Sequence, residues 1–154
     1  MREELMTLLQ LKAVQRRGWV NAGVQSPESV AAHSWGMAVL ALKLCPHDVN
    51  LEHVLKLCLV HDLPEVIVGD LTPQDDVSTK SADERAAMEV LAPEWVDLFD
   101  EYELQATPEA IFVKSLDKLD MALQAKLYME QNDLDLSEFI ESARKTLGDH
   151  ALLR

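Results

Sequence analysis

Two histidines and two aspartates occupy positions where a folded chain would surround them with apolar side chains. His61 and Asp62 end the apolar run KLCLVHD, while His33 and Asp117 each fall on an apolar face of a predicted helix. Burying a polar group without a hydrogen-bonding partner costs free energy. The four side chains therefore need partners inside the protein, and the sequence must supply them or bind something that does.

A shared divalent cation would satisfy all four groups at once. Imidazole nitrogen and carboxylate oxygen, with no sulfur, suit first-row metals such as Mn, Co, Ni, Fe or Zn, and Mg is possible. Each residue alone also has an ordinary explanation. A core histidine usually bonds to a carbonyl, Asp62 could cap a helix end, and Asp117 could pair with Lys114 or Lys118. The metal hypothesis requires the helices that carry these residues to converge.

Helical periodicity dominates the 154 residues, and no run alternates apolar and polar residues as a half-buried strand would. The absence of a repeat, low-complexity tract or linker favours one domain spanning 1–154. We predict an all-α, single-domain bundle. The helices are expected at about 2–14, 26–44, 51–64, 82–91, 95–102, 108–130 and 136–147, with a loop containing a proline turn at 69–80.

Local signals support the first two predicted helices. Leu5, Leu8, Leu9 and Ala13 recur at spacings that predict an inward stripe on the first helix. The tripeptide at 26–28, Ser-Pro-Glu, has the hydroxyl, proline and acid typical of a helix start. These elements would bring His33 toward the middle of the bundle.

Charge and composition limit the functions that the chain can have. A formal net charge of −13 disfavours binding to a nucleic-acid polymer, whose affinity comes from Lys and Arg, but a small anion could still bind beside a cation. No segment looks like a secretory signal or a membrane span. Cys45 and Cys58 lie in apolar runs and are expected to be free thiols. We expect a cytoplasmic protein without a membrane partner.

Three blocks of sequence resemble one known family. QRRGWVNAGVQSPESVAAHS, KLCLVHDLPEVIVGDLTP and FVKSLDKLDMALQA appear in the order typical of HD-domain phosphohydrolases, in their 5′-deoxynucleotidase branch. The resemblance covers about residues 8–130 and is far more specific than a His-Asp dipeptide. It implies a helical HD domain in which His33, His61, Asp62 and Asp117 bind the metal.

The resemblance also implies roles for residues that the pattern alone would not single out. Glu65 and Asp70 match family positions with acid-base or water-orienting roles, and Arg16 and Trp19 match substrate-contacting positions. Arg17 could replace Arg16, because the segment RRGW aligns either way. By themselves these residues would be interpreted as a solvated acid, a turn residue, surface cations and a core anchor.

The implied activity is removal of the 5′-phosphate from deoxynucleoside 5′-monophosphates. A deoxynucleoside triphosphate triphosphohydrolase could use the same metal site, and a catalytically silent metal-binding protein is a third hypothesis. Lys80 could contact a phosphate, but the loop at 71–81 holds one lysine and two aspartates. That charge balance favours a monophosphate over a triphosphate.

We also predict a homodimer. The family is commonly dimeric, and the segment APEWVDLF places Trp95 and Phe99 four residues apart, on one helical face. A symmetric pair of chains could cover such an apolar patch. The alternative is that both aromatic side chains pack within their own chain.

Overall fold

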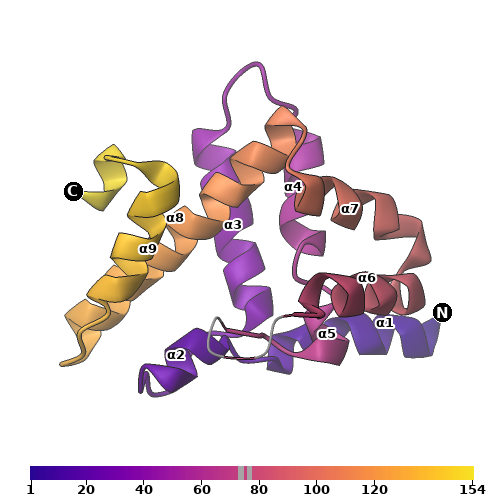
Figure 1. The fold of residues 1–154 in the computed structure, drawn as a ribbon, viewed down its shortest axis with the longest axis horizontal. Helices are drawn as coiled ribbons and strands as arrows, with labels where there is room; N and C mark the ends of the chain where they lie inside the picture. Colours follow the sequence, from indigo (N-terminus) through magenta and orange to yellow (C-terminus); the bar gives the residue numbers. More distant parts are fainter. Residues whose placement is uncertain (73–74, 76–77) are drawn as a thin grey trace.

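The computed structural model describes residues 1–72, 75 and 78–154, and these residues fold into helices joined by short connections (Figure 1). No strand occurs among them, so the predicted all-α class is confirmed. The predicted proline turn at Pro73 lies outside the described residues, as does Asp76. The elements in chain order are α1 (Arg2–Leu9), the 3-10 helix η1 (Gln10–Ala13), α2 (Arg17–Asn21), α3 (Val30–Leu44), α4 (Leu51–Val60), α5 (Glu65–Val68), α6 (Lys80–Leu91), the 3-10 helix η2 (Pro93–Trp95), α7 (Val96–Leu104), α8 (Pro108–Gln131), α9 (Ser137–Leu147) and the 3-10 helix η3 (Ala151–Leu153).

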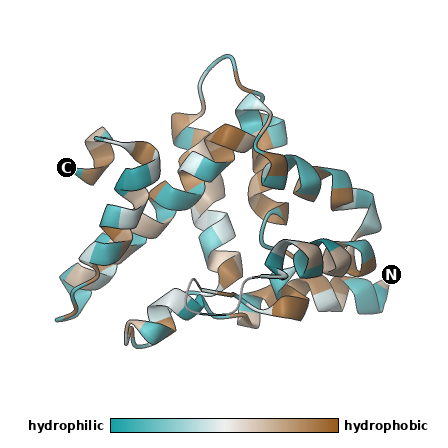
Figure 2. Ribbon diagram, viewed as in Figure 1, coloured by the Kyte–Doolittle hydropathy of each residue, from teal (hydrophilic) through white to brown (hydrophobic). Residues whose placement is uncertain are grey.

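The long helix α8 organises the bundle, crossing it with α3, α4 and α7 on one side and α9 along its second half (Figure 1). Its start is well specified, because the Thr107 side chain accepts a hydrogen bond from the Ala110 N–H at 3.1 Å and Pro108 fills the first turn. Buried apolar side chains of α3, α4, α7 and α8 form a shared core. Helices α7 and α9 in Figure 2 carry both polar and apolar bands, as expected of helices with one buried side.

Helix α3 begins later than predicted. The cap is Ser29, whose side chain accepts from the Ala32 N–H at 3.1 Å, and the predicted start at Ser26 was wrong. Ser26 has a φ of 54°, and the following residues lie against the segment before α2: the Arg16 N–H donates to the Glu28 carbonyl at 3.1 Å. Pairing of these two backbone segments prevents helix formation there and fixes Arg16 beside the start of α3.

The first helix is also shorter than predicted. It ends at Leu9 and continues as a 3-10 turn, which rotates the following side chains relative to an ideal α-helix. Leu5 and Leu9, predicted to face inward, are 51% and 56% exposed, whereas Leu11 is buried. Among the described residues, no helix has the length and apolar character needed to cross a bilayer.

Candidate metal centre

The rings of His33 and His61 are buried and held in fixed orientations. His33 Nδ1 lies 2.7 Å from Asp120 Oδ2, and His61 Nδ1 lies 2.9 Å from the Cys58 carbonyl oxygen. A carbonyl only accepts, so His61 Nδ1 carries a proton, and Nε2 is the ring atom that faces the other groups of the cluster. The Nε2 atoms of both rings are buried without a hydrogen-bond partner. Histidines bind metals through Nε2 or Nδ1, and here Nδ1 of each ring is already engaged, which leaves Nε2.

Two carboxylates face the same Nε2 atoms: Asp62, next to His61 at the end of α4, and Asp117 on α8. Asp62 Oδ2 lies 3.0 Å from His61 Nε2 and 3.8 Å from His33 Nε2, and the donor atoms of these three residues lie within 4.8 Å of one another. Asp117 Oδ1 is 3.3 Å from His33 Nε2 and so contacts the group through that ring. Helix α3, the end of α4 and the middle of α8 therefore converge, as the metal hypothesis requires.

The charges of this cluster fit a cation. Although burial alone would raise both values, the neighbouring His61 and His33 lower the pKa of Asp62, and the close approach of His33 lowers the pKa of Asp117. Burial lowers the pKa of His33, but Asp117 and Asp120 outweigh that effect and raise it to about 9. Both Nε2 atoms thus face ionised carboxylates, Asp117 beside His33 and Asp62 beside His61. A divalent ion would satisfy both rings.

The alternative partners proposed for Asp117 are also present. Lys118 Nζ and Lys114 Nζ lie 3.4 and 3.7 Å from Asp117 Oδ2, on the opposite oxygen from the one facing His33. One carboxylate thus faces the ring and the lysines at the same time. The ion pairs do not exclude a ligand role; they hold the carboxylate ionised and in place.

Asp120 is a functional candidate that the sequence interpretation missed. It follows Asp117 by three residues and so lies on the same side of α8, where its carboxylate orients His33. Gly36 of α3 provides the space, since a side chain there would overlap the Asp120 carboxylate. The sequence did contain a signal for this residue, the Asp-x-x-Asp spacing on a largely apolar helix. A histidine that binds a metal through one ring nitrogen usually bonds a carboxylate through the other, and Asp120 is placed to be that carboxylate.

Glu65 and Asp70 both line a 190 Å³ pocket over the cluster. Glu65 is 3% exposed and its Oε2 has no hydrogen-bond partner. Burial, with Asp62 and Asp70 adding to it, raises the pKa of Glu65 to about 10. Asp70 follows Gly69, whose φ of 78° allows the sharp turn after α5, and its Oδ2 accepts from the Arg17 N–H at 2.7 Å.

The structure distinguishes the two arginines. Arg16 Nη1 lies 3.8 Å from Asp62 Oδ2, with the side chain 14% exposed, and the guanidinium lines the pocket. Arg17 is 56% exposed and its Nη2 lies 4.0 Å from Asp75 Oδ1, at the outer surface. Arg16 is therefore brought to the cluster, whereas Arg17 contributes only its backbone N–H to Asp70.

Trp19 and Lys80 occupy more peripheral positions. Trp19 is 1% exposed, donates its indole N–H to Glu28 Oε1 at 3.0 Å, and is one of the residues that line a small side pocket. Lys80 lines the pocket over the cluster but lies 3.5 Å from Glu84 Oε1. Glu84 is 7% exposed and was not anticipated from the sequence. The Glu84 carboxylate offsets the positive charge of Lys80.

Comparison with known proteins places the chain in a family. The HD-domain profile matches residues 8–152, beyond the expected 8–130, and the chain belongs to the HD-domain family. The 5′-deoxynucleotidase HDDC2 of Danio rerio is 45% identical over 131 residues, which are 79% of this chain and 66% of that protein. The human protein of the same name is 41% identical over 145 residues, which are 86% of this chain and 71% of that protein. The chain thus spans about two thirds of the length of these relatives.

Solved structures show the same architecture. The PH0347 protein from Pyrococcus horikoshii is 35% identical, with a TM-score of 0.86 over 97% of this chain and 95% of its own. A protein from Magnetospirillum magnetotacticum, described as a predicted metal-dependent phosphohydrolase, is 29% identical, with a TM-score of 0.68 over 79% of this chain and 68% of its own.

Proposed function

We propose that this protein is a metal-dependent hydrolase that removes the 5′-phosphate from deoxynucleoside 5′-monophosphates. One observation carries the proposal: two buried, unpartnered imidazole nitrogens face Asp62 and Asp117 at the base of a pocket that Arg16 lines. The names of the HDDC2 relatives support the choice of substrate.

The proposed ligands are His33, His61, Asp62 and Asp117. A bound divalent ion would supply activation of a water and relief of phosphate charge. The metal is one of Mn, Co, Ni, Fe, Zn or Mg, and the two imidazole ligands favour the first five. Chelation followed by addition of single metals, with phosphate release as the measurement, identifies which of them restores activity.

The remaining roles fall to groups of the chain itself. The Arg16 fork binds phosphoryl oxygens, for which a planar guanidinium is well suited. Glu65 is within the pocket, screened from water, and transfers the proton that the leaving 5′-oxygen needs. Asp70 fixes the segment after α5 through the Arg17 N–H and completes the acidic side of the pocket. Trp19 anchors α2, so that Arg16 keeps its position.

A triphosphohydrolase is the main competing activity. A triphosphate carries about two more negative charges, which the pocket lysines Lys80, Lys114 and Lys118 would have to offset. Lys80 already faces Glu84, the other two face Asp117, and Glu103 lines the same pocket. This balance supports the monophosphate. A third hypothesis, a silent metal-binding protein, does not account for the buried Glu65.

A panel of deoxynucleoside mono- and triphosphates tests the proposal. We expect inorganic phosphate from the monophosphates and no tripolyphosphate from the triphosphates. Release of tripolyphosphate alone would make the protein a triphosphohydrolase. Full metal binding with no hydrolysis of either class would leave only the binding role.

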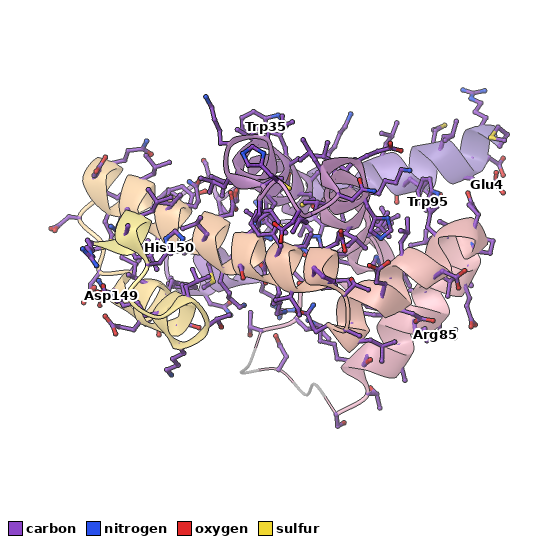
Figure 3. The ribbon with its side chains drawn as sticks, turned by 90° about the horizontal axis from the view of Figure 1, so that it is seen from above. Glu4, Trp35, Arg85, Trp95, Asp149 and His150 are labelled. Atoms are coloured by element: carbon purple, nitrogen blue, oxygen red, sulfur yellow. The ribbon has the colours of Figure 1, made fainter. Side chains whose placement is uncertain are left out.

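We further propose a cytoplasmic homodimer, which cell fractionation and light scattering test. The free thiols of Cys45 and Cys58 agree with a reducing compartment. The predicted patch, however, was wrong: Phe99 is 1% exposed and packs within its own chain. Trp35 and Leu42 of α3 are 67% and 62% exposed, and Trp35 points away from the bundle (Figure 3), which makes this face the better candidate.

The replacement Trp35→Asp should shift the protein toward the 17.3 kDa monomer in light scattering at micromolar concentration. The matched control is Trp95→Asp, at the face first predicted from Trp95 and Phe99, and it should leave the mass unchanged. A wild-type protein that is already monomeric throughout the concentration range would remove the dimer.

A further inference from the structure

The 190 Å³ pocket over the His33, His61, Asp62 and Asp117 cluster is called the metal pocket below. A groove continues from it along the side of the bundle formed by α2, α8 and α9. A small pocket of 150 Å³ shares Arg16 and Asp70 with the metal pocket, and it shares Met121 and Phe139 with a groove of 520 Å³. Lys118 lines both the metal pocket and the groove. The groove has the volume of an ordinary small-molecule site, roughly 300–1,000 Å³.

The chemistry of the groove differs from that of the metal pocket. Met121 and Phe139 give it an apolar wall, and Asn21, Glu138 and Ser142 add polar groups. Its charged lining residues are Glu138 and Lys118, and Lys118, at the end shared with the metal pocket, already faces Asp117 at 3.4 Å. Such a surface suits a flat, neutral group with a polar edge and offers little to a second phosphate.

Phe139 is positioned to support a flat group. Its ring is half-buried, with its centroid 4.4 Å from that of the buried Trp19 ring, and packs against Gly18. Trp19 is held in turn by the bond to Glu28 and by Tyr128, at a centroid distance of 5.4 Å. The phenyl ring therefore has a fixed backing and an edge or face open to the groove.

We propose that this groove binds the nucleoside part of the substrate, with the base against Phe139, and that α9 thereby sets base preference. The inference rests on the proposed function, which puts the phosphate beside Arg16 and the metal ligands. From there the rest of the ester could extend toward α6 and α7 or into the groove. The side toward α6 and α7 is lined by charged groups such as Lys80, Glu84 and Glu103, whereas the groove offers the apolar wall of Met121 and Phe139 together with a few polar groups.

Filling the groove tests the proposal without disturbing the core. Ser142 is exposed on α9 and lines the groove. Each variant is assayed with a deoxynucleoside monophosphate and with 2-deoxyribose 5-phosphate, which lacks the base, and the ratio of the two kcat/KM values is compared. We expect Ser142→Trp to lower this ratio at least about fivefold, the lower end of what a stacked base contributes.

Ser137→Trp is the matched control, since Ser137 is exposed on the same helix but does not line the groove, and it should keep the wild-type ratio. Phe139→Ala should lower the ratio by a similar factor, and Phe139→Tyr should restore most of it. Because each ratio is measured within one preparation, a loss of folded enzyme cancels.

The outcomes separate the two proposals. A wild-type enzyme that hydrolyses deoxynucleoside monophosphates, with ratios unchanged in both Ser142→Trp and Phe139→Ala, overturns the nucleoside groove and leaves the proposed function intact. A wild-type enzyme that hydrolyses neither ester overturns the function and the groove with it.

Discussion

The candidate metal centre and the mouth of its pocket are built in different ways. His33, His61 and Asp117 project from the ends or middles of packed helices, and their side chains are at most 11% exposed. Around the mouth, Lys80, which lines the pocket, is 34% exposed, and Arg17, which lies outside the pocket, is 56% exposed; each is the first residue of its helix, α6 and α2. Core packing fixes the first region, whereas local turns and ion pairs fix the second. Substitutions in the centre should therefore abolish metal binding or activity almost completely, whereas substitutions at the mouth should lower activity only in part.

The largest effect is expected for Asp117→Ala. Removing this carboxylate takes away a proposed ligand and leaves Lys114 and Lys118 beside the cluster without their partner, which further repels a cation. We expect loss of the metal and of nearly all activity, measured by elemental analysis and phosphate release. Asp97→Ala, at an exposed acid on α7, is the control. A fully metallated and active Asp117→Ala protein would show that Asp117 is only structural.

The next largest effect is expected at the buried acid Glu65, and it shows whether this side chain takes part in proton transfer or only in packing. Glu65→Gln keeps the shape of a side chain that is 3% exposed but removes its transferable proton. We expect unchanged metal content and turnover lower by about 10², the usual scale for losing a general acid or base. Turnover and metal occupancy should be measured on one preparation. Turnover like that of the wild type would remove Glu65 from the chemistry.

A smaller effect is expected one step away from the metal. Asp120→Ala frees the His33 ring, whose Nδ1 now lies 2.7 Å from the carboxylate. Loss of such an orienting partner typically lowers metal affinity about 10- to 100-fold. The change is measured by removing the metal with a chelator and then titrating the metal-free protein with metal in a calorimeter. If affinity stays at the wild-type value while the thermal midpoint falls, Asp120 supports only the packing of α3 on α8.

The sequence predicted the centre better than the mouth, for a physical reason. His33, His61 and Asp117 interrupt apolar helical faces, and helical periodicity is enough to show that such groups point inward. Asp120 was missed because its partner, His33, lies 87 residues away and only the helix crossing brings them together. The start of α3 was wrong because the pairing of Arg16 with Glu28 is a tertiary contact that overrides the local capping signal.

The mouth depended on turns that periodicity does not describe. The choice between Arg16 and Arg17 follows from the short helix α2, which begins between them, and from the bond of the Arg17 N–H to Asp70. Glu84 pairs with Lys80 one helical turn earlier, at a position where an acid on a polar helix looks like a solvated one. Neither arrangement leaves a distinctive pattern in the chain itself.

The smallest effect should come from the mouth, with Lys80→Ala. The ammonium group is partly exposed and lies 3.5 Å from Glu84, so part of its charge is already neutralised and water screens the rest. Contacts of such a group contribute about 0.2–1 kcal/mol, which corresponds to a rise in KM of at most about fivefold, with kcat unchanged.

Lys43→Ala is the control, because Lys43 is exposed at the far end of α3, ten residues from His33 and about 15 Å along the helix axis. Steady-state kinetics at two salt concentrations provide the measurement, and the difference between Lys80→Ala and wild type should shrink at high salt. A loss of turnover near that of Glu65→Gln would place Lys80 in the chemistry and would contradict the contrast between the rigid centre and the graded mouth.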